Sequence, residues 1–587
     1  MLGNEQTKFK KIMTKQLAGH LLVECLVAQG VTHAFGVPGE SFLAVLDGFH
    51  AYKDDIEFVI NRQEGGAAFM AEAAGKLTGR PGVCFVTRGP GATNASIGVH
   101  TSFQDSTPLV LFVGDVASDT RDREAFQEVN YLSFFGPSTG GMAKRVERID
   151  DAKRIPEYVA RAFATAMNGR PGPVVLVLPE DMLTQLVDAE PLPKSMPVEA
   201  WIAPESANLL REMLLKAERP FVIAGGSGWT PQSAQALQRF AENWSLPVGN
   251  AFRFQDTFDN FHPLYAGDVG IGINPKLAAR IKQSDLIIAI GSRLGEMTTS
   301  GYTLLKAPKA AQKLVHIHAS AEELGRVYQA DLAIQASMSA AASTLEQLAA
   351  PSTLPWQAWA QDANIDYLAN IDPVNGGLKL PGTIDMAAII ATLQQHLPTD
   401  AVLTNGAGNF ASWLHRFYQY HGLAKGFKTQ LAPSNGAMGY GVPAGIAANI
   451  LTKNAVTGQR VAFTIAGDGD FMMNGQELAT AAQIGAKSIV LVLNNGMFGT
   501  IRMHQEREYP HNVSGTRLAN PDFAALARAY GYAGVCITHT GQFEAELLAA
   551  LARPQGTLIE VTLNPEVIST RGSLSQITQN ALKKAAT

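Results

Sequence analysis

The chain has 587 residues, far more than the roughly 250–300 at which a single hydrophobic core stops growing, so we expect several domains. Charged residues make up 17% of it and the net charge is −5 without a basic run, which argues against nucleic acid or an anionic membrane as a partner. The longest apolar stretches, such as residues 488–493, are too short to span a bilayer. Because 46% of the residues are hydrophobic, we expect broad cores and a subunit interface.

The few cysteines favour a cytoplasmic protein. Three cysteines far apart in apolar surroundings can form neither a disulfide framework nor a zinc site, so we expect a reducing cytoplasm. Residues 1–12 are polar and basic without the apolar core of a signal peptide, and a second possible start at Met13 leaves them outside the predicted fold. Residues 566–587 either cover a site or are disordered. The cysteines are Cys25, Cys84 and Cys536.

Two segments without periodicity divide the chain. Residues 190–206 contain four prolines, and residues 350–382 combine Pro, Gly, Asn and Asp with two tryptophans that we expect to pack against a domain. Both read as linkers. The domains predicted in this way span residues 13–190, 205–350 and 380–565.

Short β-branched runs alternate with helical stretches in all three domains. The runs are apolar without alternation, as strands covered by helices on both faces are. We therefore predict an α/β protein of three doubly wound parallel-sheet domains. In the first and third domains a strand, a glycine turn and a helix follow one another, which is compatible with a distant duplication. The runs are residues 83–87, 109–113, 174–178, 221–224, 286–290, 461–465 and 488–493.

The strongest signal lies in the third domain, where Gly467-Asp468-Gly469 ends one strand and Asn494-Asn495 ends the next. A helix over residues 474–485 would complete a right-handed βαβ crossover that brings the two strand ends together. One carboxylate and one amide oxygen form part of an octahedral Mg²⁺ shell, which phosphate oxygens and water would complete. Glycines and a helix N-terminus at the same place favour a diphosphate. The alternative is an acidic turn beside an unrelated Asn pair.

Gly-Asp-Gly followed after about twenty-five residues by Asn-Asn resembles the signature of thiamine-diphosphate-dependent enzymes, and its surroundings resemble the acetolactate synthase branch. The resemblance runs from Met13 to about Pro565. It implies a pyrimidine-binding, a central and a pyrophosphate-binding domain, with thiamine diphosphate and Mg²⁺ as cofactors. The metal ligands it implies are Asp468, Asn495 and Met497. The residues it places at the cofactor are Asn409, Gly436, Met438, Gly467, Gly469, Asp470 and Gly499.

Two further segments carry parts of this resemblance. In residues 436–443, the Gly436 carbonyl would accept from the 4′-amino group of the cofactor, and Met438 would wedge under its pyrimidine ring, which suits an unbranched, polarisable side chain. The alternative is a loop with a core methionine. Asn409, in the 405–409 segment that touches the diphosphate, replaces the usual glutamine. Asp470 occupies a position that is often Ser or Ala in the family, and the sequence does not explain the negative charge that it adds.

The first domain supplies a candidate base, Glu64, in the segment Asn-Arg-Gln-Glu-Gly-Gly. A glutamate among small residues is poorly solvated and can share a proton with a neutral nitrogen. By resemblance, Glu64 bonds N1′ of the pyrimidine and promotes removal of the C2 proton. An ordinary helix glutamate is the alternative, and Glu72 would then serve as well. In the family, this glutamate and the metal site belong to different subunits, so a homodimer or homotetramer is implied.

The resemblance implies a catalytic position for Gln127, in a Phe-Gln-Glu segment whose Gln faces the bound intermediate in the synthases. It implies a substrate contact for Arg293, whose planar fork suits the carboxylate of a second keto acid. Each has a structural role as its alternative. Two residues depart from the synthases: Glu180 stands where they carry a lysine, and His504 where they carry a tryptophan. Arg88 replaces a small residue and either recognises an anionic substrate or lies at the surface.

The middle domain resembles the flavin-carrying domain of the synthases. Gly225-Gly226-Ser227-Gly228 after a strand is a nucleotide-type turn, which is a weak signal when it stands alone. The acidic residues that hold FAD in the synthases are not evident around residues 316–320 or 330–337. Whether FAD is bound stays open, with its loss favoured.

These observations predict a carboligase that decarboxylates a small 2-keto acid, such as pyruvate, and transfers the acyl unit to a carbonyl acceptor, giving acetolactate. The adjacent histidine pair of pyruvate decarboxylases is absent, which disfavours simple aldehyde release. One alternative is a related decarboxylase or 2-hydroxyacyl lyase with another substrate. The other is a regulatory paralogue that binds the cofactor without turnover, against which the presence of both Glu64 and Asp468 argues.

Overall fold

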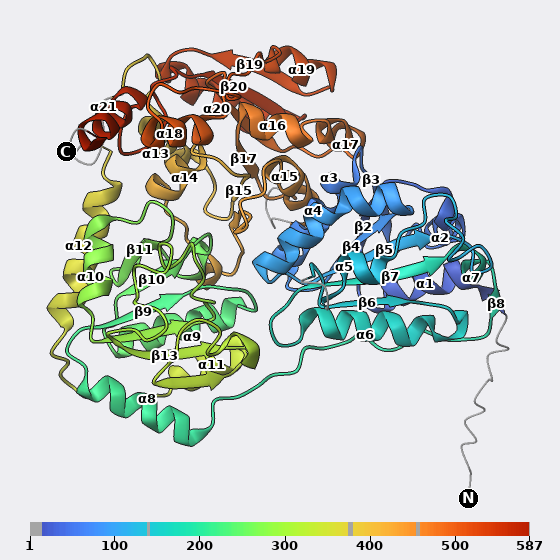
Figure 1. Cartoon of the computed structure of the whole chain (residues 1–587), viewed down its shortest axis with the longest axis horizontal. Helices are drawn as coiled ribbons and strands as arrows, with labels where there is room; N and C mark the ends of the chain where they lie inside the picture. Colours follow the sequence, from blue (N-terminus) through green and yellow to red (C-terminus); the bar gives the residue numbers. More distant parts are fainter. Residues whose placement is uncertain (1–14, 138–140, 374–379, 453–457, 586–587) are drawn as a thin grey trace, which may run out of the picture.

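The computed structural model of the chain describes residues 15–137, 141–373, 380–452 and 458–585. These residues form three α/β domains, each built on a six-stranded parallel sheet. Figure 1 shows the N-terminal domain in blue and cyan, the middle domain in green and the C-terminal domain in orange and red. The predicted fold class is therefore confirmed. The expectation for residues 1–12 falls outside the described residues.

The N-terminal domain has the strand order β3-β2-β4-β5-β7-β6, with helices on both faces of the sheet (Figure 1). Its central strands are fully buried, which explains their apolar sequences. A short antiparallel pair, β1 (Gln16–Leu17) and β8 (Leu186–Val187), joins its two ends. The strands are β2 (His33–Gly36), β3 (Glu57–Ile60), β4 (Gly82–Val86), β5 (Leu109–Asp115), β6 (Arg145–Arg148) and β7 (Pro173–Pro179). The helices are α1 (Ala18–Ala28), α2 (Leu43–Ala51), α3 (Glu64–Thr78), α4 (Gly89–Asp105), α5 (Tyr131–Phe135), α6 (Ile155–Met167) and α7 (Glu180–Leu183).

The middle domain follows a stretch over residues 188–203 that has neither helix nor strand, as its prolines predict. Its strand order is β11-β10-β9-β12-β13-β14, so the chain reverses its direction of winding between β9 and β12. The strands are β9 (Pro220–Ala224), β10 (Val248–Ala251), β11 (Tyr265–Val269), β12 (Leu286–Ile290), β13 (Lys313–His318) and β14 (Leu332–Gln335). The helices are α8 (Pro204–Lys216), α9 (Pro231–Asn243), α10 (Pro275–Gln283), α11 (Met338–Leu345) and α12 (Gln357–Ile371).

The C-terminal domain has the order β16-β15-β17-β18-β20-β19. Numbered within each domain, this is the order of the N-terminal domain, as the suggested duplication requires. The strands are β15 (Val402–Asn405), β16 (Gln430–Leu431), β17 (Ala462–Gly467), β18 (Ile489–Asn494), β19 (Ala533–Ile537) and β20 (Thr557–Thr562). The helices are α13 (Met386–His396), α14 (Ala411–Phe417), α15 (Gly441–Leu451), α16 (Asp468–Asn474), α17 (Glu477–Gln483), α18 (Gly499–Glu508), α19 (Phe523–Ala529), α20 (Phe543–Ala552) and α21 (Leu574–Ala585).

Two local expectations were wrong. Helix α12 occupies the middle of residues 350–382, where a linker was predicted, because Trp356 at its N-cap and Trp359 in its first turn dock it on the middle domain. Trp356, for example, donates its indole N–H to the Trp244 carbonyl (2.8 Å). The crossover after β17 consists of the two short helices α16 and α17 rather than one helix over residues 474–485, and it begins directly at Asp468.

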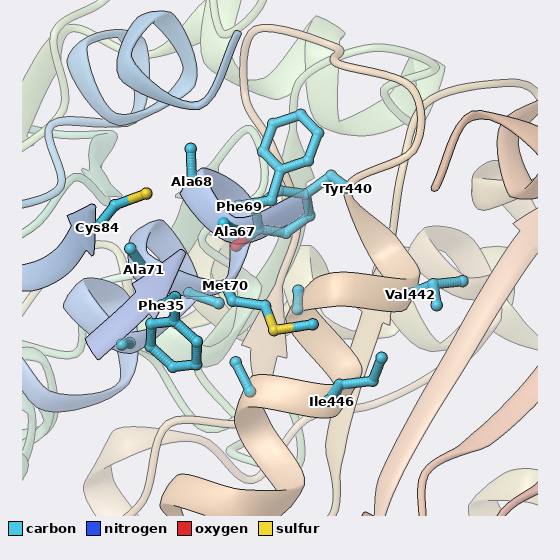
Figure 2. Packing of buried hydrophobic residues seen from close by; sticks show 14 of the residues in the cluster. Phe35, Ala67, Ala68, Phe69, Met70, Ala71, Cys84, Tyr440, Val442 and Ile446 are labelled. Atoms are coloured by element: carbon cyan, nitrogen blue, oxygen red, sulfur yellow. The ribbon is translucent and has the colours of Figure 1, made fainter. Parts of the chain in front are cut away.

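The N- and C-terminal domains share one core, in which α3 packs against α15. Helix α3 starts at its N-cap Gln63, whose side chain accepts the Gly66 N–H, and it ends at Gly79 with a positive φ. Its alanines allow the two helices to approach closely. Figure 2 shows Phe69 beside Tyr440, with ring centroids 5.4 Å apart, where the two domains meet. In the part of the chain that the structure describes, no helix is long and apolar enough to cross a membrane.

Candidate functional site

Asp468 lies where β17 ends beside β18, and it leaves the sheet next to Asn494 because the two strands are parallel neighbours. Its Oδ1 accepts the Gly469 N–H (2.9 Å), and its Oδ2 accepts the Gly496 N–H (2.9 Å) and the Asn520 side-chain amide (2.7 Å). Burial raises the pKa of Asp468, and the groups that most oppose this shift are amides rather than cations. A divalent cation would supply the positive charge that this buried carboxylate needs.

Asn495 and Met497 lie in the turn that follows β18. Asn495 Oδ1 accepts the Met497 N–H (3.2 Å) and keeps a second lone pair. In the described part of the chain no three His, Cys, Asp or Glu side chains are grouped to hold a metal. An ion bound by Asp468 and this turn would therefore take its other ligands from phosphate oxygens and water, as Mg²⁺ does. The donor set present fits a magnesium ion shared with a diphosphate.

Asn520 is a site residue that the sequence reasoning missed. Its side-chain amide donates to Asp468 and also to Asn494 Oδ1 (2.9 Å), so it holds the ends of both strands together. It follows Asp468 by 52 residues, in the loop before α19. Only the Asn-Pro turn at this position could have drawn attention to it, and such turns are common.

The glycines around Asp468 have a packing role that the sequence did not indicate. A Cβ atom on Gly467 would lie 2.8 Å from the Phe410 ring, and one on Gly469 would lie 2.5 Å from the Phe498 ring. A Cβ on Gly499 would lie 2.9 Å from Ile568. These three glycines make room for neighbouring apolar side chains, and a role at the cofactor stays a proposal.

Asp470 is buried and joins two loops, the 406–410 loop and the 432–440 loop. Its Oδ1 accepts the N–H groups of Ala407 (3.1 Å) and Gly439 (2.9 Å). Burial raises the pKa of Asp470 to about 7. The charge that the sequence left unexplained thus serves to fix the relative position of the two loops.

The 432–440 loop carries Gly436 and Met438. Gly436 has a φ of 72°, a backbone conformation that favours glycine. A Cβ atom at this position would have no neighbour within 4 Å, so the residue faces open space. Met438 is half-buried. The loop is held from the N-terminal domain, because Asp105 at the end of α4 accepts the Ser434 N–H (2.7 Å).

Behind this loop lies a buried charge network between the two domains. Glu72 accepts hydroxyl hydrogens from Tyr440 (2.6 Å) and Thr107 (2.7 Å), and it pairs with Lys76 (3.1 Å). Lys76 also pairs with Asp105. Burial raises the pKa of Glu72, and Lys76 opposes that shift. Glu72, the alternative candidate for the base, is therefore part of the support of the 432–440 loop.

Asn409, in the 406–410 loop, is bound on two sides. Its N–H donates to the Thr500 hydroxyl (2.9 Å) at the start of α18, and its side-chain amide donates to the Ile568 carbonyl (3.1 Å). The chain then runs into α21, which packs on α18 through a bond from Thr578 to Glu506 (2.9 Å). Of the two expectations for the C-terminal stretch, the structure supports the one in which it covers a site.

A cavity of about 940 Å³ lies where the three domains meet. Four of the predicted site residues line it: Asn409, Gly436, Arg293 and His504. His504 is exposed on α18. The cavity also exposes Arg253, which the sequence reasoning missed because nothing in its surroundings marks it. Arg253 donates to the Gly406 carbonyl (3.0 Å), and burial lowers its pKa to about 10.

Arg293, the predicted substrate arginine, already has two partners. It donates to the Gln104 carbonyl (2.8 Å) at the end of α4, and its Nε lies 3.6 Å from Glu323. Arg170 pairs with the same Glu323 (2.8 Å). A substrate carboxylate would therefore have to share Arg293 with a buried glutamate.

Glu64 lies at the carboxyl edge of the N-terminal sheet, as the first residue of α3. Its Oε2 accepts the side-chain amide of Asn94 (2.9 Å) on α4. Gly91 is so close that a Cβ there would lie 3.5 Å from Glu64 Oε1. The carboxyl group is thus oriented by α4 and is only partly buried.

Arg88 is buried beside two carboxylates, Glu180 (2.6 Å) and Glu40 (2.8 Å). Arg88 and Glu180, which depart separately from the synthase pattern, thus form one ion pair. Of the two alternatives for Arg88, the surface location is wrong. The two carboxylates balance the positive charge of the guanidinium, so an anionic substrate would have to displace one of them.

Gln127 belongs to the exposed loop that follows β5. Its backbone has a φ of 66°, which is uncommon for a side chain of this size, and its carbonyl accepts the Gly89 N–H (3.0 Å) at the start of α4. Glu128 fixes the loop by accepting the N–H groups of Asp122 (2.8 Å) and Ala125 (2.9 Å). The loop therefore has a defined shape next to Glu64 and Arg88.

Apart from Arg293 in the middle domain, the candidate residues form two groups in one chain. Glu64, Arg88 and Gln127 occupy the carboxyl edge of the N-terminal sheet and do not line the cavity. The predicted metal ligands and cofactor loops occupy the carboxyl edge of the C-terminal sheet. Within the described residues, Glu64 has no hydrogen bond or ion pair with the second group.

In the middle domain, the glycine turn after β9 lies at the point where the strand order reverses, which is where open α/β sheets bind ligands. Gly226 and Arg293 line the cavity there. The stretches 316–320 and 330–337 do not line it, and His316 bonds the Ser292 carbonyl (2.8 Å).

Comparison with known protein families gives a match in each domain. The N-terminal TPP binding domain of thiamine pyrophosphate enzymes matches residues 17–134, the central domain of these enzymes matches residues 208–348, and their C-terminal TPP binding domain matches residues 406–561. The matches follow the three sheets.

Similar proteins of known function cover nearly the whole chain. The acetolactate synthase large subunit of Lactococcus lactis is 30% identical over 570 residues, which are 94% of this chain and 94% of that protein. Acetolactate synthase isozyme 2 large subunit of Escherichia coli is 29% identical, over 92% of this chain and 95% of its own. Acetolactate synthase 2, chloroplastic, of Nicotiana tabacum is 30% identical, over 92% and 81%.

Proposed function

Because the chain belongs to the thiamine pyrophosphate enzyme family, we propose that it decarboxylates a small 2-keto acid and transfers the acyl unit to a second carbonyl compound, as in the formation of acetolactate from pyruvate. The observation that carries this proposal is Asp468, a buried carboxylate without a cationic partner among its main contacts, at the ends of two adjacent strands and beside the loops of Asn409 and Gly436. We expect the enzyme to act in the cytoplasm, where its free thiols stay reduced.

We propose that Mg²⁺ would be held by Asp468, Asn495 and the Met497 carbonyl. The cofactor would be held by the loops around Asn409, Gly436 and Met438. When bound, thiamine diphosphate supplies the electron sink for loss of CO₂. Glu64 would share a proton with N1′ of the pyrimidine ring. The residues placed at the cofactor by resemblance alone are Gly467, Gly469, Asp470 and Gly499.

We propose that the site is completed by a second copy of the chain. Large apolar side chains are exposed next to both groups of residues, which a subunit interface would cover. Phe126 adjoins Gln127 and is 74% exposed, and Met472 on α16 is 50% exposed. Glu64 of one subunit would then meet Asp468 of the other in a homodimer or homotetramer.

Mixing two impaired variants tests this arrangement, at a cofactor concentration that saturates the intact site but not Asp468→Asn. If each site combines Glu64 from one chain with Asp468 from another, a hybrid of Glu64→Gln and Asp468→Asn chains has one intact site, so random mixing should restore about a quarter of the activity. If both residues of a site came from one chain, no mixture would be active. Each variant mixed with itself serves as the control.

The reaction is tested by incubating the purified protein with pyruvate, thiamine diphosphate and Mg²⁺ and identifying the products. Acetolactate supports the proposal, whereas acetaldehyde supports a simple decarboxylase. If neither forms, a panel of other 2-keto acids and aldehydes tests a 2-hydroxyacyl lyase. Exchange of the cofactor C2 hydrogen separates these enzymes from a regulatory paralogue, which would bind the cofactor without accelerating exchange.

Specificity is proposed to depend on His504 and Arg293, which line the cavity, and on Gln127 in the loop after β5. Arg88 would act indirectly, through its pair with Glu180. We leave flavin out of the proposed chemistry, because residues 316–320 and 330–337 offer no acidic side chain to the cavity. A visible spectrum of the purified protein with flavin absorption would overturn this part of the proposal.

A further inference from the structure

Glu477, on α17 of the C-terminal domain, is a buried glutamate whose partners lie mainly in the N-terminal domain. Its Oε1 accepts the backbone N–H groups of Arg62 (3.1 Å) and Gln63 (3.0 Å). Its Oε2 accepts the side-chain amide of Asn61 (3.0 Å) and the hydroxyl of Thr480 (2.7 Å). The carboxylate thus binds donors only, and three of the four belong to the turn between β3 and α3.

This turn sets the position of Glu64. Gln63 precedes it and caps α3, because its side chain accepts the Gly66 N–H (3.1 Å). With the N–H groups of Arg62 and Gln63 bound to Glu477, the backbone that enters α3 is fixed from the other domain. Among the residues that the structure describes, the Glu64 carboxyl group has a single hydrogen-bond partner, Asn94, so the location of its Cα depends on the turn.

The two glycines after Glu64 have a spatial reason. A Cβ on Gly66 would lie 2.6 Å from Glu477 Oε1, and a Cβ on Gly65 would lie 2.7 Å from the Gln63 side-chain oxygen. Any larger residue at Gly66 would displace the Glu477 carboxylate. The Glu-Gly-Gly pattern is therefore explained by the approach of Glu477 and the helix cap.

A glutamine could not replace Glu477 without loss. It offers one acceptor oxygen in place of two, and its NH₂ group would face N–H donors. Asn61 cannot simply turn over to compensate, because its own side-chain oxygen accepts the Gly36 N–H (3.2 Å). Leaving buried donors unpaired is costly, so the turn would move or open.

We propose that Glu477 is the positioning residue for Glu64, so that the C-terminal domain of a chain sets the geometry of the glutamate which that chain contributes to catalysis. This inference rests on the proposed function of Glu64. It assigns no contact with substrate or cofactor to Glu477, which acts through the backbone of the β3–α3 turn.

The first test needs no cofactor. In the purified full chain, amide hydrogen exchange of peptides covering residues 61–66 should become at least about tenfold faster in Glu477→Gln. The glutamine NH₂ group must face either the Asn61 amide or the N–H groups of Arg62 and Gln63, so the turn that carries these N–H groups opens more often. The matched control is Gln483→Ala. It removes a bond from the Arg62 side chain to the same domain (2.6 Å) but leaves the backbone N–H groups paired. Faster exchange in Glu477→Gln alone supports the proposal, and unchanged exchange overturns it.

The second test uses the enzyme with thiamine diphosphate and Mg²⁺. Glu477→Gln should lower kcat at least about tenfold and slow C2-hydrogen exchange of the bound cofactor, while cofactor affinity changes less than about threefold. Gly66→Ala should reproduce this effect without a change of charge, and Glu477→Asp should restore part of the activity. A parallel loss of cofactor affinity and kcat would indicate general unfolding and overturn the assignment.

The proposed function can fail separately. If Glu64→Gln itself leaves C2-hydrogen exchange unchanged, Glu64 is not the activating group, whatever happens to the turn. If Glu64→Gln abolishes exchange while Glu477→Gln loosens the turn without affecting kcat, the function stands and the positioning role is wrong.

Discussion

The N- and C-terminal domains have the same strand order, yet the same edge of each sheet carries different chemistry. In both domains a helix follows the second strand, α3 in one and α15 in the other, and these two helices pack on each other. The segment before α3 leads into Glu64, whereas the longer segment before α15 carries Gly436 and Met438. A shared topology thus fixes where functional groups lie, while loop length and sequence decide which groups they are.

Each of the two domains also has a buried carboxylate that accepts hydrogen bonds from the other domain. Asp105, on the helix after the third strand of the N-terminal domain, accepts the Ser434 N–H in the segment before α15. Glu477, in the crossover after the third strand of the C-terminal domain, accepts two N–H groups in the segment before α3. Each domain therefore holds the functional segment of the other, which explains why these acids are buried.

The largest expected effects distinguish the catalytic role of the N-terminal sheet edge from the cofactor-binding role of the C-terminal sheet edge. Glu64→Gln should lower kcat by about 10²–10⁴-fold, the usual contribution of a general acid–base group, with cofactor affinity nearly unchanged. Asp468→Asn should instead weaken the apparent affinity for Mg²⁺ and thiamine diphosphate at least about tenfold, because a charged metal ligand is lost. Steady-state kinetics at varied cofactor concentration measures both.

Glu57→Gln, an exposed glutamate on β3, is the control for the first variant and should behave as wild type. Turnover of Glu64→Gln within about tenfold of wild type would show that the activation step is wrongly assigned. If Asp468→Asn bound the cofactor normally, the binding role assigned to the edge of the C-terminal sheet would be wrong.

The buried network that supports the 432–440 loop predicts a large effect on stability. Lys76→Met leaves Glu72 and Asp105 close together without a cation, and removing one partner of a buried ion pair costs about 3–5 kcal/mol. The same substitution at Lys276, whose pair with Asp366 is largely exposed on the lysine side, should cost less than about 1 kcal/mol. Urea unfolding followed by intrinsic fluorescence compares the two, and similar costs would mean that the network is not essential to the interface.

The sequence predicted the architecture because buried parallel strands leave a clear signal, and each of the seven apolar runs lies in a parallel strand apart from at most one terminal residue. It also predicted that the strand ends carrying Asp468 and Asn494-Asn495 lie side by side, which follows from the βαβ crossover rule. It could not predict Asn520 or Arg253, because they reach the site through loops whose course depends on tertiary packing. The roles of Asp470 and Glu477 were hidden for a related reason, since a carboxylate that binds backbone N–H groups has no preferred sequence context.

The middle domain contributes a buried aspartate, Asp268, to the lining of the cavity. Its Oδ1 has no hydrogen-bond partner among the described residues. Burial raises the pKa of Asp268 from 3.8 to about 8, with Arg253 opposing the shift. The folded chain therefore retains a proton that the unfolded chain releases, and stability falls as the pH rises from about 4 to about 8. Asp268→Asn should flatten this slope and raise the midpoint of thermal unfolding at pH 7 to 8 by several degrees.

Asp362→Asn, an exposed aspartate on α12, is the control and should keep the wild-type slope of the unfolding midpoint against pH. If Asp268→Asn kept that slope as well, the pKa of Asp268 would not be raised in the folded protein. A lower midpoint for Asp268→Asn at pH 7 would mean that the ionised carboxylate is required there.

The smallest expected effect concerns the ion pair at the edge of the N-terminal sheet. Arg88 is buried, whereas Glu180 is 39% exposed, so Arg88→Gln should destabilise more than Glu180→Gln, and the double variant should show a coupling of about 0.5–1 kcal/mol. Because its guanidinium is already paired, Arg88→Gln should change KM for pyruvate less than about threefold. A much larger increase in KM without loss of stability would mean that Arg88 leaves Glu180 to bind the substrate, and the edge of the N-terminal sheet would then share the binding role assigned here to the C-terminal one.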